Sequence, residues 1–162
     1  DELMAGTETV QTPTLAICPE VTKPENLGLV FRSAAALGIR GVLLGPTCCD
    51  LFSRRALRVS MGAVLTLPWA RSEDILADLE ALGGRWRFEL VATVLDPRAE
   101  RLDEFRWPQR LGLVFGSEFD GVRHHWLEKC HRRITIPMQP GTDSLNLGVA
   151  AGIFLYEASR RA

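Results

Sequence analysis

Residues 111–121 read Leu-Gly-Leu-Val-Phe-Gly-Ser-Glu-Phe-Asp-Gly, a short apolar run that passes directly into a glycine, a hydroxyl and two carboxylates. A run without alternation is typical of a strand in a parallel sheet that helices cover on both faces. Such sheets bind ligands outside the carboxyl ends of their strands. The segment therefore predicts a buried parallel strand at 111–115 followed by a site loop, although an ordinary polar turn would have a similar composition.

Short apolar runs alternate with helical patterns along the rest of the chain. We expect further strands at 15–18, 41–44, 64–67, 88–95 and 134–136. We expect helices at 26–37, 51–59, 72–82, 124–130 and 145–160. Candidate helix caps are Asp50, Ser72, and either Asp143 or Ser144. This order predicts an α/β fold with a mostly parallel sheet flanked by helices.

Length and composition indicate one ordinary globular domain. The chain has 162 residues, a hydrophobic fraction of 46% and a formal net charge of −1. No apolar run approaches the roughly 20 residues that span a bilayer, and the polar start does not resemble a signal peptide. We therefore expect a polar tail at 1–13, a single domain at 14–162, no membrane association and a cytoplasmic location.

The residues that most often bind metals or nucleotides do not form the usual motifs. The four cysteines include no CxxC pair, and the three histidines all fall in 124–131 without zinc-ligand spacing. We predict no metal site. There is also no GxGxxG, no GxxxxGK[ST] and no GxSxG, which argues against a dinucleotide enzyme and against a common Rossmann-type methyltransferase.

Residues 24–32 form a second polar segment at the expected start of a helix. Asn26 and Arg32 are six positions apart, about 600° of helical rotation, so they do not share one face. Gly28 lowers helix propensity, which suggests that a backbone or a ligand approaches closely there. Asn26 as a simple helix cap and Arg32 on a solvated face are equally compatible with this pattern.

Residues 134–150 form a third polar segment, in which Pro137 ends a strand and a capped helix follows. Asn146 is expected in the first turn of that helix, where it is a weak helix former but can both donate and accept hydrogen bonds. Gly148 and Gly152 form a small-residue stripe that permits close packing of another backbone. A capped helix weakened by glycine is the plainer interpretation.

Together these segments resemble the SpoU (TrmH) branch of the SPOUT superfamily of RNA ribose 2′-O-methyltransferases, from about Thr14 to Arg161. The residues that match the family motifs are Asn26, Gly28 and Arg32; Arg58, Ser60 and Gly62; Gly116, Glu118 and Gly121; and Ile136, Pro137, Met138, Ser144, Leu145, Asn146 and Glu157. The chain departs from the usual Ser-Leu-Asn-Val-Ser pattern at Leu147 and Gly148, so one helix hydroxyl is lost.

The resemblance implies a C-terminal trefoil knot, a homodimer with an active site shared between subunits, and methyl transfer from S-adenosylmethionine to a ribose 2′-hydroxyl of tRNA or rRNA. It implies catalytic roles for Arg32, Asn26, Glu118, Ser144 and Asn146. It implies cofactor contacts from Thr93, Gly116, Ile136, Met138 and Leu145. Arg54, Arg55 and Arg58 are candidate RNA contacts, although they could equally form a solvated helix face. The alternative function is a non-catalytic RNA-binding module on the same fold.

Overall fold

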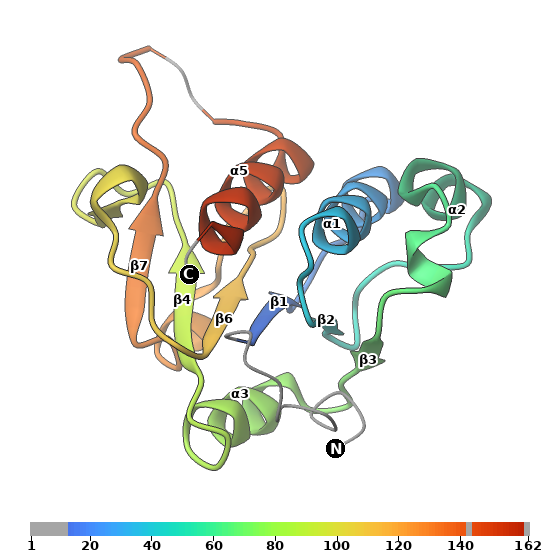
Figure 1. Ribbon diagram of the computed structural model, residues 1–162, viewed down its shortest axis with the longest axis horizontal. Helices are drawn as coiled ribbons and strands as arrows, with labels where there is room; N and C mark the ends of the chain where they lie inside the picture. The colour runs from blue at the N-terminus through green and yellow to red at the C-terminus, as the bar shows by residue number, and fades with distance from the viewer. Residues whose placement is uncertain (1–12, 142–143, 161–162) are drawn as a thin grey trace.

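A single parallel sheet lies between two layers of helices (Figure 1). The computed structural model describes residues 13–141 and 144–160. The strands are β1 (Thr14–Cys18), β2 (Gly41–Leu44), β3 (Trp69–Arg71), β4 (Glu89–Thr93), β5 (Glu100–Arg101), β6 (Leu111–Val114) and β7 (Arg132–Thr135). The helices are α1 (Pro24–Ala36), α2 (Arg54–Ser60), α3 (Ile75–Gly83), α4 (His124–Leu127) and α5 (Leu147–Ser159). The sheet order is β3-β2-β1-β6-β4-β7-β5, and all of these pairings are parallel. The predicted α/β class is confirmed.

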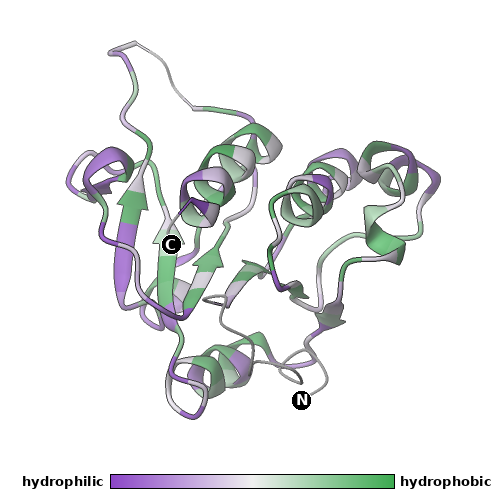
Figure 2. Cartoon of the chain, viewed as in Figure 1, coloured by the Kyte–Doolittle hydropathy of each residue, from purple (hydrophilic) through white to green (hydrophobic). Residues whose placement is uncertain are grey.

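The central strands contribute to two separate cores because successive side chains of a strand point to opposite faces. In β1, Ala16 and Cys18 join the core beneath α1 and α5, while Leu15 and Ile17 join the core above α3 and α4. All four are fully buried. Figure 2 shows the central strands as hydrophobic and the first half of β7 as hydrophilic. The strands without alternation are therefore those that helices cover on both sides, as expected.

The predicted strand at 64–67 is wrong. Met61 and Gly62 both have positive φ at the end of α2, and Ala63–Leu65 then forms a 3₁₀ helix. Pairing with β2 begins only at Pro68, whose carbonyl accepts from the Val42 N–H at 3.0 Å. The third strand is therefore β3, and the two-residue strand β5 was not predicted.

The helix caps also differ from the predictions. Asp74, not Ser72, caps α3, because its carboxylate accepts from two N–H groups of the first turn, while the Ser72 N–H donates to Leu44 O of the sheet at 2.7 Å. Ser53, not Asp50, caps α2. Asn146, not Ser144, caps α5, and Asp143 lies outside the described residues.

Two glycines allow the helices over β1 to pack closely. A Cβ on Gly28 would lie 3.0 Å from Ala56 O of α2, so the predicted close approach is that of a neighbouring backbone. A Cβ on Gly148 would lie 2.5 Å from Leu29 Cδ1 of α1, and one on Gly152 would lie 3.5 Å from Ser33 Oγ. The small-residue stripe of α5 therefore packs against α1 of the same chain.

Arg132 joins the strands at one edge of the sheet. Its guanidinium donates to Glu100 at 2.7 and 2.5 Å, and to Glu89 and the Arg106 carbonyl at 2.9 Å each. It also lies 3.9 Å from the centroid of the Phe105 ring. Hydrogen bonding to Arg132 lowers the pKa of Glu100. One side chain thus connects β7, β5, β4 and the segment before β6.

We expect Arg132→Met to lower the free energy of unfolding by about 1–3 kcal/mol, because it leaves two carboxylates without their shared donor. A lowered carboxylate pKa stabilises the fold above the unfolded pKa, and this contribution disappears as the pH falls through the folded pKa. The difference in unfolding free energy between wild type and Arg132→Met should therefore persist down to about pH 4 and shrink below it.

Urea unfolding at several pH values measures this difference, with Arg98→Met as the control. The Arg98 side chain is 88% exposed, and exposed ion pairs contribute little to stability, so Arg98→Met should unfold much as wild type does. Equal losses in both variants would contradict this role for Arg132.

Two predictions concern parts of the chain that lie outside the described residues. The connection from β7 to α5 passes through residues 142–143, which lie outside the described residues, and the trefoil knot stays a prediction. The polar tail at 1–13 lies outside them as well, except for Pro13. Among the described residues, no helix has the length and apolar character needed to cross a membrane.

Candidate active site

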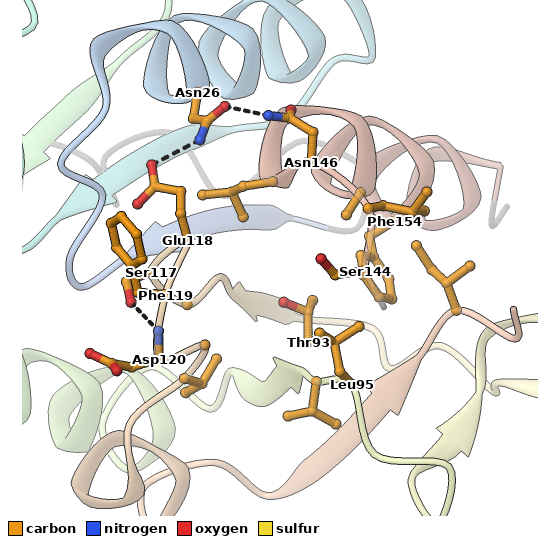
Figure 3. Close-up of a pocket in the computed structure, with 18 of the residues that line it drawn as sticks. Asn26, Thr93, Leu95, Ser117, Glu118, Phe119, Asp120, Ser144, Asn146 and Phe154 are labelled. Carbon is orange, nitrogen blue, oxygen red and sulfur yellow. Dashed lines mark hydrogen bonds between the residues drawn. The ribbon is translucent and has the colours of Figure 1, made fainter. Parts of the chain in front are cut away.

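A pocket of about 650 Å³ lies at the carboxyl ends of β4, β6 and β7, against the start of α5 (Figure 3). Residues 93–96 and 116–122, together with Ile136 and Met138, contribute to its lining, as expected for the loops that follow these three strands. Leu95, Ile136 and Phe154 give it apolar walls, while Asn26 and Glu118 place polar groups on one side. Both the volume and the mixed lining are typical of a site for a small organic molecule.

A chain of hydrogen bonds crosses one side of this pocket, from α5 through α1 to the loop after β6 (Figure 3). Asn146 Oδ1 accepts from the Gly148 and Val149 N–H groups, so its Nδ2 is free to donate to Asn26 Oδ1 at 2.9 Å. Asn26 Nδ2 in turn donates to Glu118 Oε1 at 2.9 Å. The helix cap thereby fixes the orientation of both amides and holds the Glu118 carboxylate in place.

Asn26 can take part in this chain because it is not the cap of α1. Lys23 holds the cap position without a side-chain capping bond, Pro24 occupies the first turn, and Asn26 is only 2% exposed. The Lys23 N–H donates to Glu118 Oε1 at 3.3 Å. Glu118 Oε2 is buried and has no hydrogen-bond partner among the described residues. A buried carboxylate oxygen without a partner is costly, so this atom is suited to accept a hydrogen bond from a ligand.

The loop after β6 is a tight turn closed by its own backbone. Ser117 and Gly121 exchange two backbone hydrogen bonds of 3.0 and 3.1 Å, and Ser117 Oγ accepts from the Asp120 N–H at 3.0 Å. A Cβ on Gly116 would lie 1.9 Å from the Gly121 carbonyl carbon. A side chain at position 116 has no room beside Gly121, so a glycine is required for the turn to close.

The structure brings nine of the ten residues predicted for catalysis or cofactor binding to this pocket: Asn26, Thr93, Gly116, Glu118, Ile136, Met138, Ser144, Leu145 and Asn146. The Thr93 hydroxyl already donates to Val114 O at 3.1 Å. The tenth, Arg32, is exposed on α1 and does not line the pocket. Arg54, Arg55 and Arg58 are exposed on α2, also outside the pocket, and Arg55 pairs with Glu25 at 3.8 Å.

Several pocket residues were not predicted from the sequence. Lys23, Asp96, Phe119 and Arg133 all line the pocket. Phe119 is a large apolar residue within the polar segment 116–121, and this contrast could have identified it from the sequence. Arg133 had no such signal, because arginine is abundant throughout this chain.

The surroundings of Cys49, Cys130 and His131 indicate that these residues support the fold and do not form a reactive site. Burial is the main cause that raises the pKa of the Cys49 thiol to about 11 and that of Cys130 to about 12, so neither is a thiolate nucleophile at neutral pH. His131 Nδ1 accepts from the Leu90 N–H at 2.9 Å. Within residues 13–141 and 144–160, no three His, Cys, Asp or Glu side chains form a group that could hold a metal ion.

An all-parallel sheet with a pocket of mixed polar and apolar lining at the carboxyl ends of its strands is typical of a ligand-binding α/β domain, and comparisons with known proteins give its family. The sequence model of the SpoU rRNA Methylase family matches residues 13–156. An uncharacterized tRNA/rRNA methyltransferase of Mycobacterium bovis is 38% identical over 98% of this chain and 54% of its own length. The 23S rRNA (guanosine-2'-O-)-methyltransferase RlmB of Salmonella typhi is 34% identical over 92% of this chain and 60% of its own length.

The structural comparison agrees. The SpoU methyltransferase AviRb from Streptomyces viridochromogenes, solved in complex with the cofactor AdoMet, superposes with a TM-score of 0.84 at 28% identity, over 94% of this chain and 62% of that chain. The chain belongs to the SpoU family. It spans about half the length of the curated relatives it matches, 54% of one and 50% of another.

Proposed function

We propose that this chain is the catalytic domain of an RNA methyltransferase that transfers a methyl group from S-adenosylmethionine to a ribose 2′-hydroxyl of tRNA or rRNA. The domain comprises residues 14–162. The observation that carries the proposal is the position of the three family motifs: residues far apart in sequence meet in one pocket, joined by the hydrogen bonds from Asn146 through Asn26 to Glu118.

The lining of the pocket fits S-adenosylmethionine. Ile136, Met138 and Leu145 provide an apolar surface for the adenine, and Glu118 Oε2 provides an acceptor for a hydroxyl or an ammonium group. The bound cofactor supplies an activated sulfonium methyl. The protein has to align the ribose oxygen with that methyl, and such alignment contributes on the order of 7–11 kcal/mol to lowering a barrier.

Arg32 acts in this proposal on the RNA rather than on the cofactor. Its guanidinium would hold and polarise the ribose hydroxyl or a neighbouring phosphate, because a guanidinium stays protonated in proteins and a neutral arginine base is therefore costly. Arg32 is exposed and lies outside the pocket of its own chain. This placement fits a homodimer in which each subunit contributes Arg32 to the site of the other.

The exposed face of α5 supports such a homodimer. Val149 and Tyr156, seven positions apart, are both 50% exposed on this helix, and residues at this spacing lie on one face. Light scattering should show a dimer at about 10 µM, while a persistent monomer would remove the shared-site part of the proposal. A cytoplasmic location, where tRNA and rRNA are modified, belongs to the same proposal.

Isothermal titration calorimetry with S-adenosylmethionine and S-adenosylhomocysteine tests whether the chain is a methyltransferase or a non-catalytic RNA-binding module. We expect both ligands to bind and NADH to give no heat, because no dinucleotide fingerprint is present in the sequence. If neither methyl-cycle ligand binds the folded protein, the enzyme function is wrong and the non-catalytic module becomes the better explanation.

A further inference from the structure

Phe119 is exposed at the mouth of the pocket and has no role in the chemistry described above. Its side chain is 79% exposed, and it lines the pocket beside Glu118 (Figure 3). A single exposed aromatic residue is common on protein surfaces and needs no explanation by itself. Its position at the opening of the pocket is the first reason to consider a function.

The turn that carries Phe119 is held by its own hydrogen bonds. The paired Ser117 and Gly121 backbones and the Asp120 N–H bonded to Ser117 Oγ fix the residues on both sides of the ring. Gly116 packs directly against the backbone of Gly121. A closed turn therefore presents the ring to solvent. Because the turn is already ordered, less conformational entropy is lost when a partner binds.

A cation lies against this ring. Lys23 Nζ is 4.9 Å from the Phe119 ring centroid, and none of the ion pairs found among the described residues includes Lys23. The Lys23 backbone is bound to Glu118, so both residues are attached to the same polar side of the pocket. An aromatic face beside an available ammonium suits a ligand that is flat and negatively charged.

Exposed arginines of α2 lie near the start of α1. Arg55 of α2 lies 3.8 Å from Glu25, which is two residues after Lys23. Arg54 and Arg58 are exposed on the same short helix. Exposed cations together with an aromatic side chain are typical of surfaces that bind single-stranded nucleic acid.

We propose that Phe119 and Lys23 form a stacking platform for a nucleobase of the single-stranded RNA that enters the pocket, with the Lys23 ammonium on the adjoining phosphate. The proposal rests on the proposed function, and it names the two residues that would bind the RNA substrate at the opening of the pocket. Sequence-specific RNA recognition commonly uses unpaired bases stacked on aromatic rings. The platform binds the RNA at the opening, and the cofactor site lies behind it.

The test measures fluorescence anisotropy of a labelled 12-nucleotide oligouridylate, with the intact protein and saturating S-adenosylhomocysteine. Phe119→Tyr should bind as wild type, because it keeps the π face, whereas Phe119→Leu and Phe119→Ala should bind about tenfold more weakly. Trp86→Leu is the control, since Arg85 lies 5.0 Å from that ring and both residues precede β4, at the amino end of that strand. The control should bind RNA as wild type, and all variants should keep their affinity for S-adenosylhomocysteine.

A second variant reports on stacking directly. In Phe119→Trp, added oligouridylate should quench the emission well beyond the change seen in wild type. The platform is wrong if Phe119→Leu binds RNA as tightly as wild type, or if Phe119→Leu dissociates the dimer, which would place the ring in a protein interface. Wild type that binds neither S-adenosylhomocysteine nor RNA would refute the proposed function as well. Wild type that binds both, with Phe119→Leu unaffected, would refute the platform alone.

Discussion

Arg32→Ala is expected to lose methyl transfer by about 100-fold or more while retaining its affinity for S-adenosylmethionine. Arg32 is the one predicted catalytic residue outside the pocket of its own chain, so its removal should leave the cofactor contacts intact. An interaction made mainly in the transition state appears in the rate and not in ground-state binding. Arg32→Lys should not restore activity, since an ammonium lacks the planar fork of the guanidinium. Single-turnover methylation together with calorimetry measures both quantities.

Arg85→Ala is a matched control, because Arg85 is exposed near the amino end of β4, away from the pocket. It should methylate as wild type. Near-wild-type turnover by Arg32→Ala on an RNA that wild type methylates well would contradict the assigned role.

A mixing experiment tests whether Arg32 serves the partner subunit. Arg32→Ala and Glu118→Ala should each be inactive alone, but randomly exchanged dimers should recover about a quarter of the wild-type sites, because each mixed dimer has one intact site. No recovery in mixtures that demonstrably exchange subunits would place Arg32 and Glu118 in the site of the same chain.

Gly116→Ala is expected to have the second largest effect. The added Cβ would meet Gly121 and the Val122 nitrogen at 1.9 and 2.2 Å, and both contacts are with backbone. The turn would have to open, at a cost above the roughly 3 kcal/mol of ordinary overpacking. We expect either an unfolded protein or a folded one without measurable S-adenosylmethionine binding, measured by thermal unfolding and calorimetry.

Gly152→Ala provides the control for the same chemical change. Its Cβ would have only an ordinary contact with Ser33 Oγ at 3.5 Å, and alanine is favoured over glycine in a helix by about 1 kcal/mol. This variant should be at least as stable as wild type and bind the cofactor equally well. Wild-type stability and cofactor affinity in Gly116→Ala would show that the turn is not constrained as described.

Much of the fold could be predicted from the sequence because the central strands carry a strong signal. Residues 15–18, 41–44 and 111–115 are apolar without alternation, and they form β1, β2 and β6 of the buried sheet. Residues 64–67 have a similar composition but form no strand. There the local turn at Met61 and Gly62 determines the backbone, and an apolar run of four residues does not reveal it.

The site could be predicted in part, through motif positions rather than geometry. Asn26 and Asn146 are 120 residues apart, and no periodicity predicts their 2.9 Å hydrogen bond. The rotation between Asn26 and Arg32 did predict that they face different directions, and one is buried while the other is exposed. Phe119 and Lys23 were missed because their proximity depends on how the turn after β6 packs against the start of α1.

Methyl transfer into RNA is the most direct test of the central claim. The protein is incubated with methyl-tritiated S-adenosylmethionine and total RNA, and the labelled RNA is digested with alkali and mapped with nucleases. We expect label in alkali-resistant dinucleotides at a defined tRNA or rRNA position, because a 2′-O-methyl group blocks cleavage at the adjoining phosphate. Label released entirely as mononucleotides would place the methyl on a base and contradict ribose methylation. No label in any RNA, from protein that binds S-adenosylmethionine, would contradict the assignment of RNA as the substrate.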